Sequence, residues 1–311
     1  MPTRIRLALD WTPNTNHTGF FIALANGSYE RVGLQVEFIS PDADDYRLTP
    51  ARRVARGEAE LAVAPSESII SFQTNAVPMV AVAAMLARDA SAIVTLKQSG
   101  LDRPSRLDGK VYASYSARYE DEIIRQMIVN DGGRGQFVSH KPARLDIWHA
   151  LLTNEADATW IFLPWEGVEA EQRDIQLNQF LLEEYEIPYG YSPVLAAHHN
   201  WASQNADALR GFLAATTEGF QFAVRDPDEA ARILLETARH PTLTDLDFLE
   251  KSQQVASGYY LDVDGRWGVM RRDVWNAFVG WLIRNRLLNY PDGELIQHFD
   301  VSTLYTNDYL G

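Results

Sequence analysis

The stretch "LALDWTPNTNHTGFFIALANGSYERVGLQVEFIS", residues 7–40, decides the fold class. An apolar run stops at Asp10 and Trp11, a polar segment follows, and apolar residues then recur at helical spacing as far as Gly33. The next apolar run, residues 34–40, predicts a second strand. Strand, helix and strand in this order form a βαβ unit, which is typical of a mainly parallel α/β sheet. Loops at the carboxyl ends of such strands are where α/β folds bind ligands.

The alternation of short apolar runs and single helices continues along the chain and then starts a second time with "SAIVTLK", residues 91–97. Beyond about residue 200 the pattern is helical, and helices are predicted over residues 205–226, 227–240 and 271–288. Two α/β units followed by a helical C-terminal region predict two lobes, with the chain passing from one lobe to the other more than once.

The candidate crossing strands are "AIVTLK", residues 92–97, and "YSPVLAAH", residues 191–198. We therefore expect a discontinuous first lobe, residues 1–91 plus 198–311, and a second lobe, residues 92–197. The fold class is α/β, with a mainly parallel sheet flanked by helices in each lobe.

Composition excludes several classes of function. The chain has 311 residues, with 28 basic and 42 acidic side chains and a net charge of -14, which argues against nucleic acid or an anionic membrane as the main partner. It has no cysteine, so disulfides, thiolate metal sites and cysteine nucleophiles are excluded. No apolar stretch is long enough to span a bilayer. The first residues read as a strand and not as a leader, so we expect a cytoplasmic protein as the sequence stands, or a periplasmic one if a leader was removed.

The common fingerprints of catalysis and cofactor binding are missing from the sequence. It contains no G-x-G-x-x-G, no G-x-x-x-x-G-K-[ST], no G-x-S-x-G and no H-E-x-x-H. The adjacent pair His198 and His199 makes a poor chelate, because neighbouring residues of a strand point to opposite faces. We therefore predict no catalytic residue, no metal site and no cofactor.

Several predicted strand ends share one pattern, in which aromatic rings lie beside Asn, Ser or Glu. Any one of them is also explained by helix capping or by core packing. Together they indicate a cleft lined for a flat, polar ring. The candidate ligand-binding residues are Trp11, Asn16, His17, Ser66, Glu67, Tyr115, Tyr119, Trp165, Glu166, Tyr189 and Tyr191.

Four segments of the chain resemble the thiamine-pyrimidine-precursor binding proteins and their relatives, the fungal pyrimidine synthases of thiamine biosynthesis. These segments are "LDWTPNTNHTGFFIALANGSYERVGLQVEFISP", "RRVARGEAELAVAPSESII", "AIVTLKQSGLDRPSRLDGK" and "LYTNDYL". The resemblance implies a type II periplasmic-binding-protein fold whose two lobes close by a hinge around an aminopyrimidine of the hydroxymethyl or formylaminomethyl type. It also implies an ABC transporter permease as the partner of bacterial members. We expect Trp11 and Glu166 to lie on opposite walls of this cleft.

The chain departs from the synthases where their chemistry takes place. In the segment "GEAELAVAPSES", the cofactor-binding lysine of the synthases would fall at Ala64 and their consumed histidine at Ser68. Without this amine and this imidazole the synthase reaction has no reactants, and we predict a binding protein.

Two alternatives remain open. One is a cytosolic enzyme of thiamine biosynthesis that uses the same cleft for different chemistry. The other is a binder of another small ligand, such as an alkanesulfonate or a flavin. The sequence leaves the exact pyrimidine open, because a formylated amine, a hydroxymethyl group and a phosphate all fit the pattern.

Overall fold

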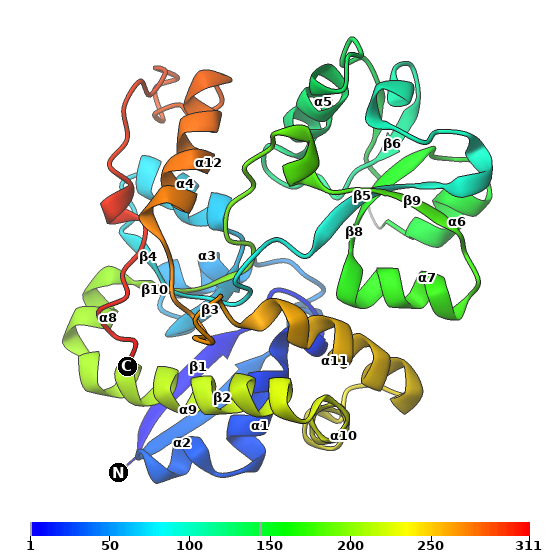
Figure 1. Ribbon diagram of the computed structural model, residues 1–311. Coiled ribbons are helices and arrows are strands. Elements are labelled where there is room, and N and C mark those ends of the chain that lie inside the picture. The colour runs from blue at the N-terminus through cyan, green and yellow to red at the C-terminus, as the bar shows by residue number, and fades with distance from the viewer. Residues whose placement is uncertain (1, 143–144) are drawn as a thin grey trace. The chain divides into compact units, whose positions relative to one another are not determined.

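A computed structural model describes residues 2–142 and 145–311. The chain divides into two compact units: unit 1 is Met1–Asp89 with Gly190–Gly311, and unit 2 is Ala90–Tyr189 (Figure 1). The second boundary differs from the predicted one, which placed residues up to 197 in the middle lobe. Residues 190–197 belong to unit 1 because their strand pairs on both sides with strands of that unit.

The sheet of unit 1 has five strands. Their spatial order is β2 (Leu34–Ile39), β1 (Thr3–Ala8), β3 (Leu61–Ala64), β10 (Val194–His198) and β4 (Met79–Ala84). β1 runs parallel to β2 and β3, whereas β10 runs antiparallel to β3 and β4, so only β10 is reversed. The carboxyl ends of β1, β2 and β3 therefore meet at one side of the sheet, which we call the unit 1 edge.

Helices flank this sheet and supply most of the rest of unit 1. They are α1 (Thr18–Ala25), α2 (Ser28–Arg31), α3 (Pro50–Ala55), α4 (Ser66–Thr74), α8 (His199–Gln204), α9 (Ala206–Arg225), α10 (Pro227–Ala238), α11 (Leu246–Tyr260) and α12 (Arg272–Arg284). The long helix α9 packs along α1 (Figure 1). A Cβ atom on Gly219 would lie 2.0 Å from the carbonyl oxygen of Gly19, so the two backbones approach too closely for any side chain.

Unit 2 repeats the same sheet plan. Its strands lie in the order β7 (Val138–His140), β6 (Val111–Ala113), β8 (Ala158–Phe162), β5 (Ser91–Leu96) and β9 (Leu177–Phe180). β6 is parallel to β7 and β8, and β5 is antiparallel to β8 and β9. The mainly parallel sheets predicted from the sequence are thus confirmed, with one reversed strand in each. The carboxyl ends of β6 and β8 are neighbours, and we call this side the unit 2 edge.

The helices of unit 2 are α5 (Glu120–Asn130), α6 (Ile147–Leu152) and α7 (Val168–Gln172). A π-helical turn, η5 (Leu163–Gly167), joins β8 to α7. Short 3-10 turns complete both units: η1 (Thr15–His17), η2 (Pro41–Asp44), η3 (Lys97–Ser99), η4 (Pro104–Leu107), η6 (Leu182–Tyr185) and η7 (Val301–Thr303). Across residues 2–142 and 145–311, no helix combines the length and the apolarity that a bilayer crossing requires.

Candidate functional site

The junction between β1 and α1 is held by its own polar side chains. Asn14 Oδ1 accepts a hydrogen bond from Asn16 N–H at 2.9 Å, and Asn14 Nδ2 donates to the Thr12 carbonyl at 3.0 Å. His17 is fully buried, with Nε2 2.8 Å from the Asp10 carboxylate, and its Nδ1 accepts from the Asn14 N–H at 3.4 Å. Both ring nitrogens of His17 are therefore engaged within the loop. His17 therefore positions the junction, and a ligand contact for it stays a prediction.

Helix α11 provides a second anchor for the same junction, and the sequence reasoning missed it. Thr15 Oγ1 lies 2.8 Å from Ser252 Oγ, and Thr18 Oγ1 donates to Gln253 Oε1 at 2.6 Å. Each of these side chains is at most 1% exposed. Because buried polar groups are costly unless they are paired, this network fixes the junction at a defined place on the sheet.

Trp11 and Asn16 are the other two candidate ligand-binding residues of this junction. The Trp11 side chain is 49% exposed, and its ring centroid lies 5.2 Å from that of Tyr46. Asn16 Oδ1 is buried, and no hydrogen-bond donor reaches it among residues 2–142 and 145–311. A buried carbonyl oxygen without a donor costs about 1–3 kcal/mol, so Asn16 is a candidate acceptor for a ligand N–H group.

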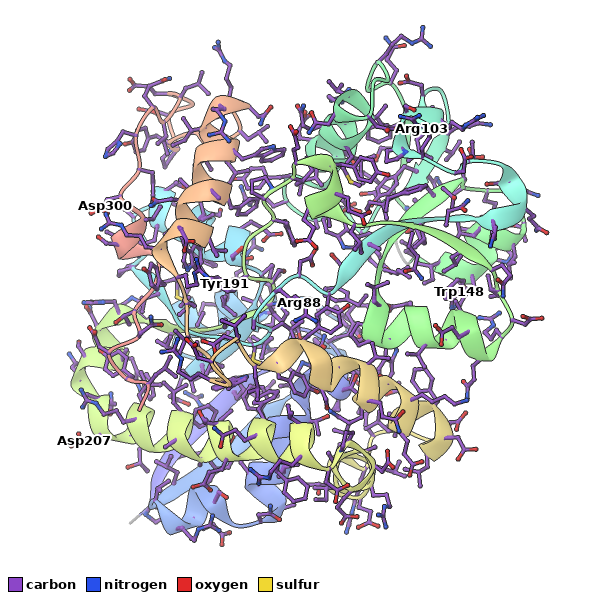
Figure 2. The ribbon with its side chains drawn as sticks, in the orientation of Figure 1. Arg88, Arg103, Trp148, Tyr191, Asp207 and Asp300 are labelled. Atoms are coloured by element: carbon purple, nitrogen blue, oxygen red, sulfur yellow. The ribbon has the colours of Figure 1, made fainter. Side chains whose placement is uncertain are left out.

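The junction between β3 and α4 carries Ser66 and Glu67, which are 0% and 3% exposed. The Ser66 N–H donates to the Tyr191 carbonyl at 3.2 Å, so the segment before β10 lies against the unit 1 edge. The Tyr191 hydroxyl accepts from the Arg271 N–H at 3.0 Å, next to the start of α12 (Figure 2). Tyr191 is 4% exposed and its hydroxyl is engaged at the start of α12, and a ligand contact for it stays a prediction.

On unit 2, the loop between β6 and α5 is organised by the buried carboxylate of Glu120. This carboxylate accepts hydrogen bonds from the loop backbone and from two hydroxyls. Ser116 and Tyr119 have φ angles of 61° and 64°, a left-handed conformation that non-glycine residues rarely adopt. The strained loop leaves the Tyr115 side chain 43% exposed. Strain of this kind is typical of functional loops that the surrounding structure holds in place.

The turn after β8 carries Trp165 and Glu166. Glu166 is half-buried, and its Oε2 accepts from the Phe162 N–H at 2.9 Å. Burial raises the pKa of the Glu166 carboxyl to about 7, and the nearby Glu169 adds to the increase. The pKa of Tyr115 is also raised, because its hydroxyl is removed from solvent although part of the residue is exposed, and the charge of Glu166 raises it further.

Each unit, taken by itself, therefore gathers its predicted residues at the carboxyl ends of its parallel strands. Unit 1 brings together Trp11, Asn16, His17, Ser66, Glu67 and Tyr191, and unit 2 brings together Tyr115, Tyr119, Trp165 and Glu166. The ring of Tyr189 lies 5.3 Å from that of Trp160 on β8, and a ligand contact for Tyr189 stays a prediction. Strand ends of this kind are the usual ligand-binding positions of open α/β sheets.

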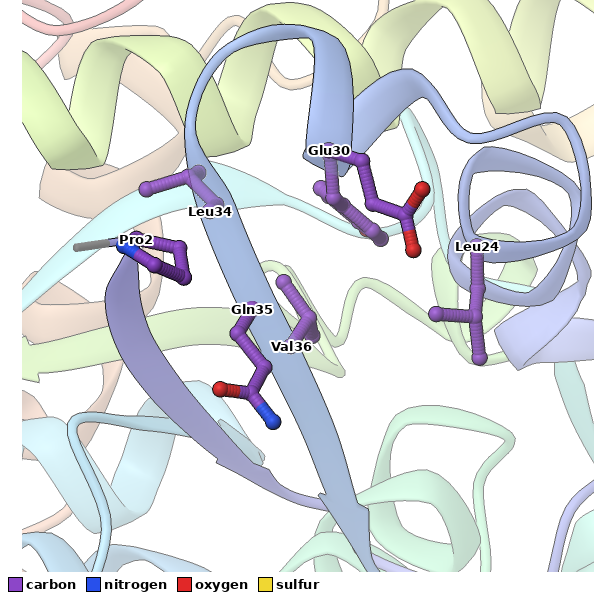
Figure 3. A pocket seen from close by; sticks show the side chains of 7 residues that line it. Pro2, Leu24, Glu30, Leu34, Gln35 and Val36 are labelled. Atoms are coloured by element: carbon purple, nitrogen blue, oxygen red, sulfur yellow. The ribbon is translucent and has the colours of Figure 1, made fainter.

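A groove of about 440 Å³ in unit 1 is not part of this edge (Figure 3). Pro2 and Leu34, at the amino ends of β1 and β2, line it together with Leu24, Glu30 and Gln35. None of the predicted ligand-binding residues borders this groove. Because α/β sheets bind ligands at the carboxyl ends of their strands, we do not assign it to the site.

The possible metal ligands among the described residues and the two synthase positions bear on catalysis. Within residues 2–142 and 145–311, no three His, Asp or Glu side chains are grouped in a way that would hold a metal ion. Ala64 is the last residue of β3 and Ser68 lies in the first turn of α4. Neither position supplies the amine or the imidazole of the synthase reaction.

The fold defines a class of protein. The periplasmic aliphatic sulphonate binding protein SsuA from Escherichia coli has the same fold, with a TM-score of 0.69 and 14% sequence identity, over 94% of this chain and 96% of that chain. The chain therefore has the two-lobed, type II periplasmic-binding-protein fold.

The family described as NMT1/THI5 like matches residues 14–230, and this chain belongs to that family. The formylaminopyrimidine-binding protein of Halalkalibacterium halodurans is 24% identical over 293 residues, which are 92% of this chain and 87% of that protein. The 4-amino-5-hydroxymethyl-2-methylpyrimidine phosphate synthase of Legionella pneumophila is 22% identical over 317 residues, covering 100% of this chain and 93% of that protein. The resemblance to pyrimidine-binding proteins predicted from the sequence is confirmed at the level of the family.

Proposed function

We propose that this chain is a substrate-binding protein that captures a thiamine-related aminopyrimidine. The observation that carries the proposal is Glu166, a half-buried carboxyl at the unit 2 edge whose pKa is raised to about 7 and whose neighbours include the partly exposed side chain of Tyr115. A similar ligand is named for the Halalkalibacterium halodurans relative, which covers most of this chain.

The chemistry of Glu166 suits an exocyclic amine. One carboxylate oxygen, Oε2, is fixed by the Phe162 N–H, which orients the group. In its ionised form Glu166 can also accept from an amine N–H of the ligand, and a hydrogen bond to a charged group is worth about 1.5–3 kcal/mol. Such a contact would favour the ionised form of a carboxyl whose pKa is about 7 in the folded chain. Aromatic rings such as Tyr115 and Trp165 supply flat surfaces against which a pyrimidine stacks. At the unit 1 edge, Trp11 offers an aromatic surface for stacking and Asn16 offers a hydrogen-bond acceptor.

We favour binding over catalysis as the role of these residues. The Legionella pneumophila relative is named as a synthase, but Ala64 and Ser68 lack the groups that the synthase reaction consumes. As a binding protein, the chain would pass its ligand to an ABC transporter permease, in keeping with the importer role of proteins that share the fold. This role places it outside the cytoplasm, and fractionation of cells that produce it from its own gene distinguishes that location from a cytoplasmic one.

Titration calorimetry on two variants tests the proposal. The ligands are 4-amino-5-hydroxymethyl-2-methylpyrimidine and its analogue without the amine. Glu166→Gln should weaken the aminopyrimidine by about 10-fold to 100-fold and affect the analogue much less, because only the amine contacts the carboxylate. Glu171→Gln, at an exposed position of α7, is the matched control and should leave both affinities unchanged. Equal losses for the two ligands in Glu166→Gln would remove Glu166 from the site.

A further inference from the structure

The loop at the start of α5 contains a buried carboxylate that four donors surround. Glu120 is 2% exposed. Its Oε1 accepts from the Tyr112 hydroxyl at 2.8 Å and from the Tyr115 N–H at 3.1 Å. Its Oε2 accepts from the Ser114 hydroxyl at 2.8 Å and from the Ala117 N–H at 2.9 Å. Each oxygen of the carboxylate therefore has two donors.

This donor set has the composition of an oxyanion site. Backbone N–H groups and hydroxyls that converge between a strand and the first turn of a helix are the groups that bind phosphate and sulfonate oxygens in proteins. Here these donors bind the carboxylate of Glu120, which is part of the chain itself. An incoming phosphate would have to displace Glu120 and leave a buried carboxylate without its donors, which is costly.

The charges around this loop also disfavour a second anion. The carboxylates of Glu166, Glu120 and Glu169 all act on the hydroxyl of Tyr115 at the unit 2 edge. The nearest cation along the loop, Arg118, is exposed, and its guanidinium lies 5.8 Å from the centre of the Tyr119 ring.

Two other cations near the start of α5 are already paired. Lys141 Nζ lies 2.6 Å from the Asp121 carboxylate, and Arg125 Nε lies 3.2 Å from the Glu122 carboxylate. The unit 2 edge is therefore acidic, and its strongest oxyanion donors are occupied.

We infer that Glu120 makes this edge selective for ligands that carry no phosphate or sulfonate group, by filling the donor set that such a group would use. The inference deepens the proposed function and rests on it for the identity of the ring: the ligand is an unphosphorylated aminopyrimidine. Glu120 acts through the loop and has no contact with the ligand, so it is a specificity-determining residue and not a catalytic one.

Two measurements on the full chain test this inference. The first compares the affinities of the wild type for 4-amino-5-hydroxymethyl-2-methylpyrimidine and for its phosphate monoester. Like charges placed together cost several kcal/mol, so the wild type should prefer the alcohol by at least about 100-fold. Glu120→Ala empties the position and should reduce this preference to about 10-fold or less. Comparable affinity of the wild type for the two ligands would overturn the inference.

The second measurement uses formate, a free carboxylate, and so does not depend on the pyrimidine. Formate should raise the melting temperature of Glu120→Ala, because it refills the four-donor position. It should have no such effect on the wild type or on Glu120→Gln, in which the position stays filled. If no pyrimidine binds but formate raises the melting temperature of Glu120→Ala alone, the proposed ligand is wrong. The claim that Glu120 occupies the four donors is then still supported. If formate stabilises the wild type as much as Glu120→Ala, the donors are not filled by Glu120 and the inference fails.

Discussion

Glu166 should make the folded chain less stable at high pH, and Glu166→Gln should remove this penalty. The pKa of its carboxyl is about 7 in the folded chain, against an ordinary value of 4.5. Between these two values the folded chain keeps a proton that the unfolded chain has lost. The stability that this proton provides is therefore complete below about pH 4.5 and is lost as the pH rises through about 7.

The size of the effect follows from the same two values. The full difference corresponds to at most about 3 kcal/mol in the free energy of unfolding. Working from about pH 5.5 to about pH 8.5 avoids the isoelectric point of about 4.9 and covers at most about 2 kcal/mol of this range. The Glu166 side chain keeps some contact with solvent, which reduces the effect. We therefore expect the free energy of unfolding of Glu166→Gln, relative to that of the wild type, to increase by about 1–2 kcal/mol between the lower and the higher pH.

Urea unfolding of both proteins at the two pH values measures this difference. Glu171→Gln is again the control, since its side chain is exposed on α7, the short helix that follows the turn of Glu166, and should give no pH-dependent gain. A stability difference between Glu166→Gln and the wild type that stays the same at both pH values would refute the reasoning. A carboxyl kept at a cost to stability is the pattern expected of a functional residue.

Three further predictions concern unit 1. Gly219→Ala should destabilise the chain by about 2–3 kcal/mol in a thermal melt, because the new Cβ would lie 2.0 Å from the Gly19 carbonyl oxygen. The control is Gly258→Ala, which has open space for the new Cβ and should be neutral or stabilising. Asn16→Ala should weaken aminopyrimidine binding about 10-fold in calorimetry with little loss of stability, since its Oδ1 has no donor to lose within the described part of the chain. Trp11→Ala should weaken flat ligands with and without the amine alike, by about 1 kcal/mol beyond simple burial; a larger loss for one of them would argue against a stacking role.

Most of the helices and strands follow from hydrophobic periodicity, and the exceptions have physical causes. The helix predicted over residues 205–226 is α9, Ala206–Arg225. The single helix expected up to Gly33 is instead two, because Gly27 adopts a φ of 67° and separates α1 from α2. Helix α11 was missed because its buried face includes Ser252 and Gln253, both 0% exposed, and polar residues on the inner face hide the apolar period.

The candidate site was predictable in outline but not in the role of each side chain. Trp11 and Asn16 follow a strand, and their position alone predicts where they lie. Which polar residue turns inward depends on contacts that a sequence does not contain: His17 is buried by its bonds to Asp10 and Asn14. Glu120 was missed for a similar reason. Three acidic residues in a row, 120–122, look like ordinary charges in the first turn of a helix, and the left-handed backbone at Tyr119 decides which of them turns inward.

The most direct test of the central claim is to ask which small molecule the wild-type chain retains. The purified protein is incubated with an equimolar mixture of a formylaminopyrimidine, 4-amino-5-hydroxymethyl-2-methylpyrimidine, an alkanesulfonate and a flavin. It is then separated from free ligand, and the bound molecule is released and identified by mass spectrometry. The account predicts an intact aminopyrimidine in about equimolar amount to the protein. Retention of the sulfonate or the flavin, or release of a chemically altered pyrimidine, would contradict it.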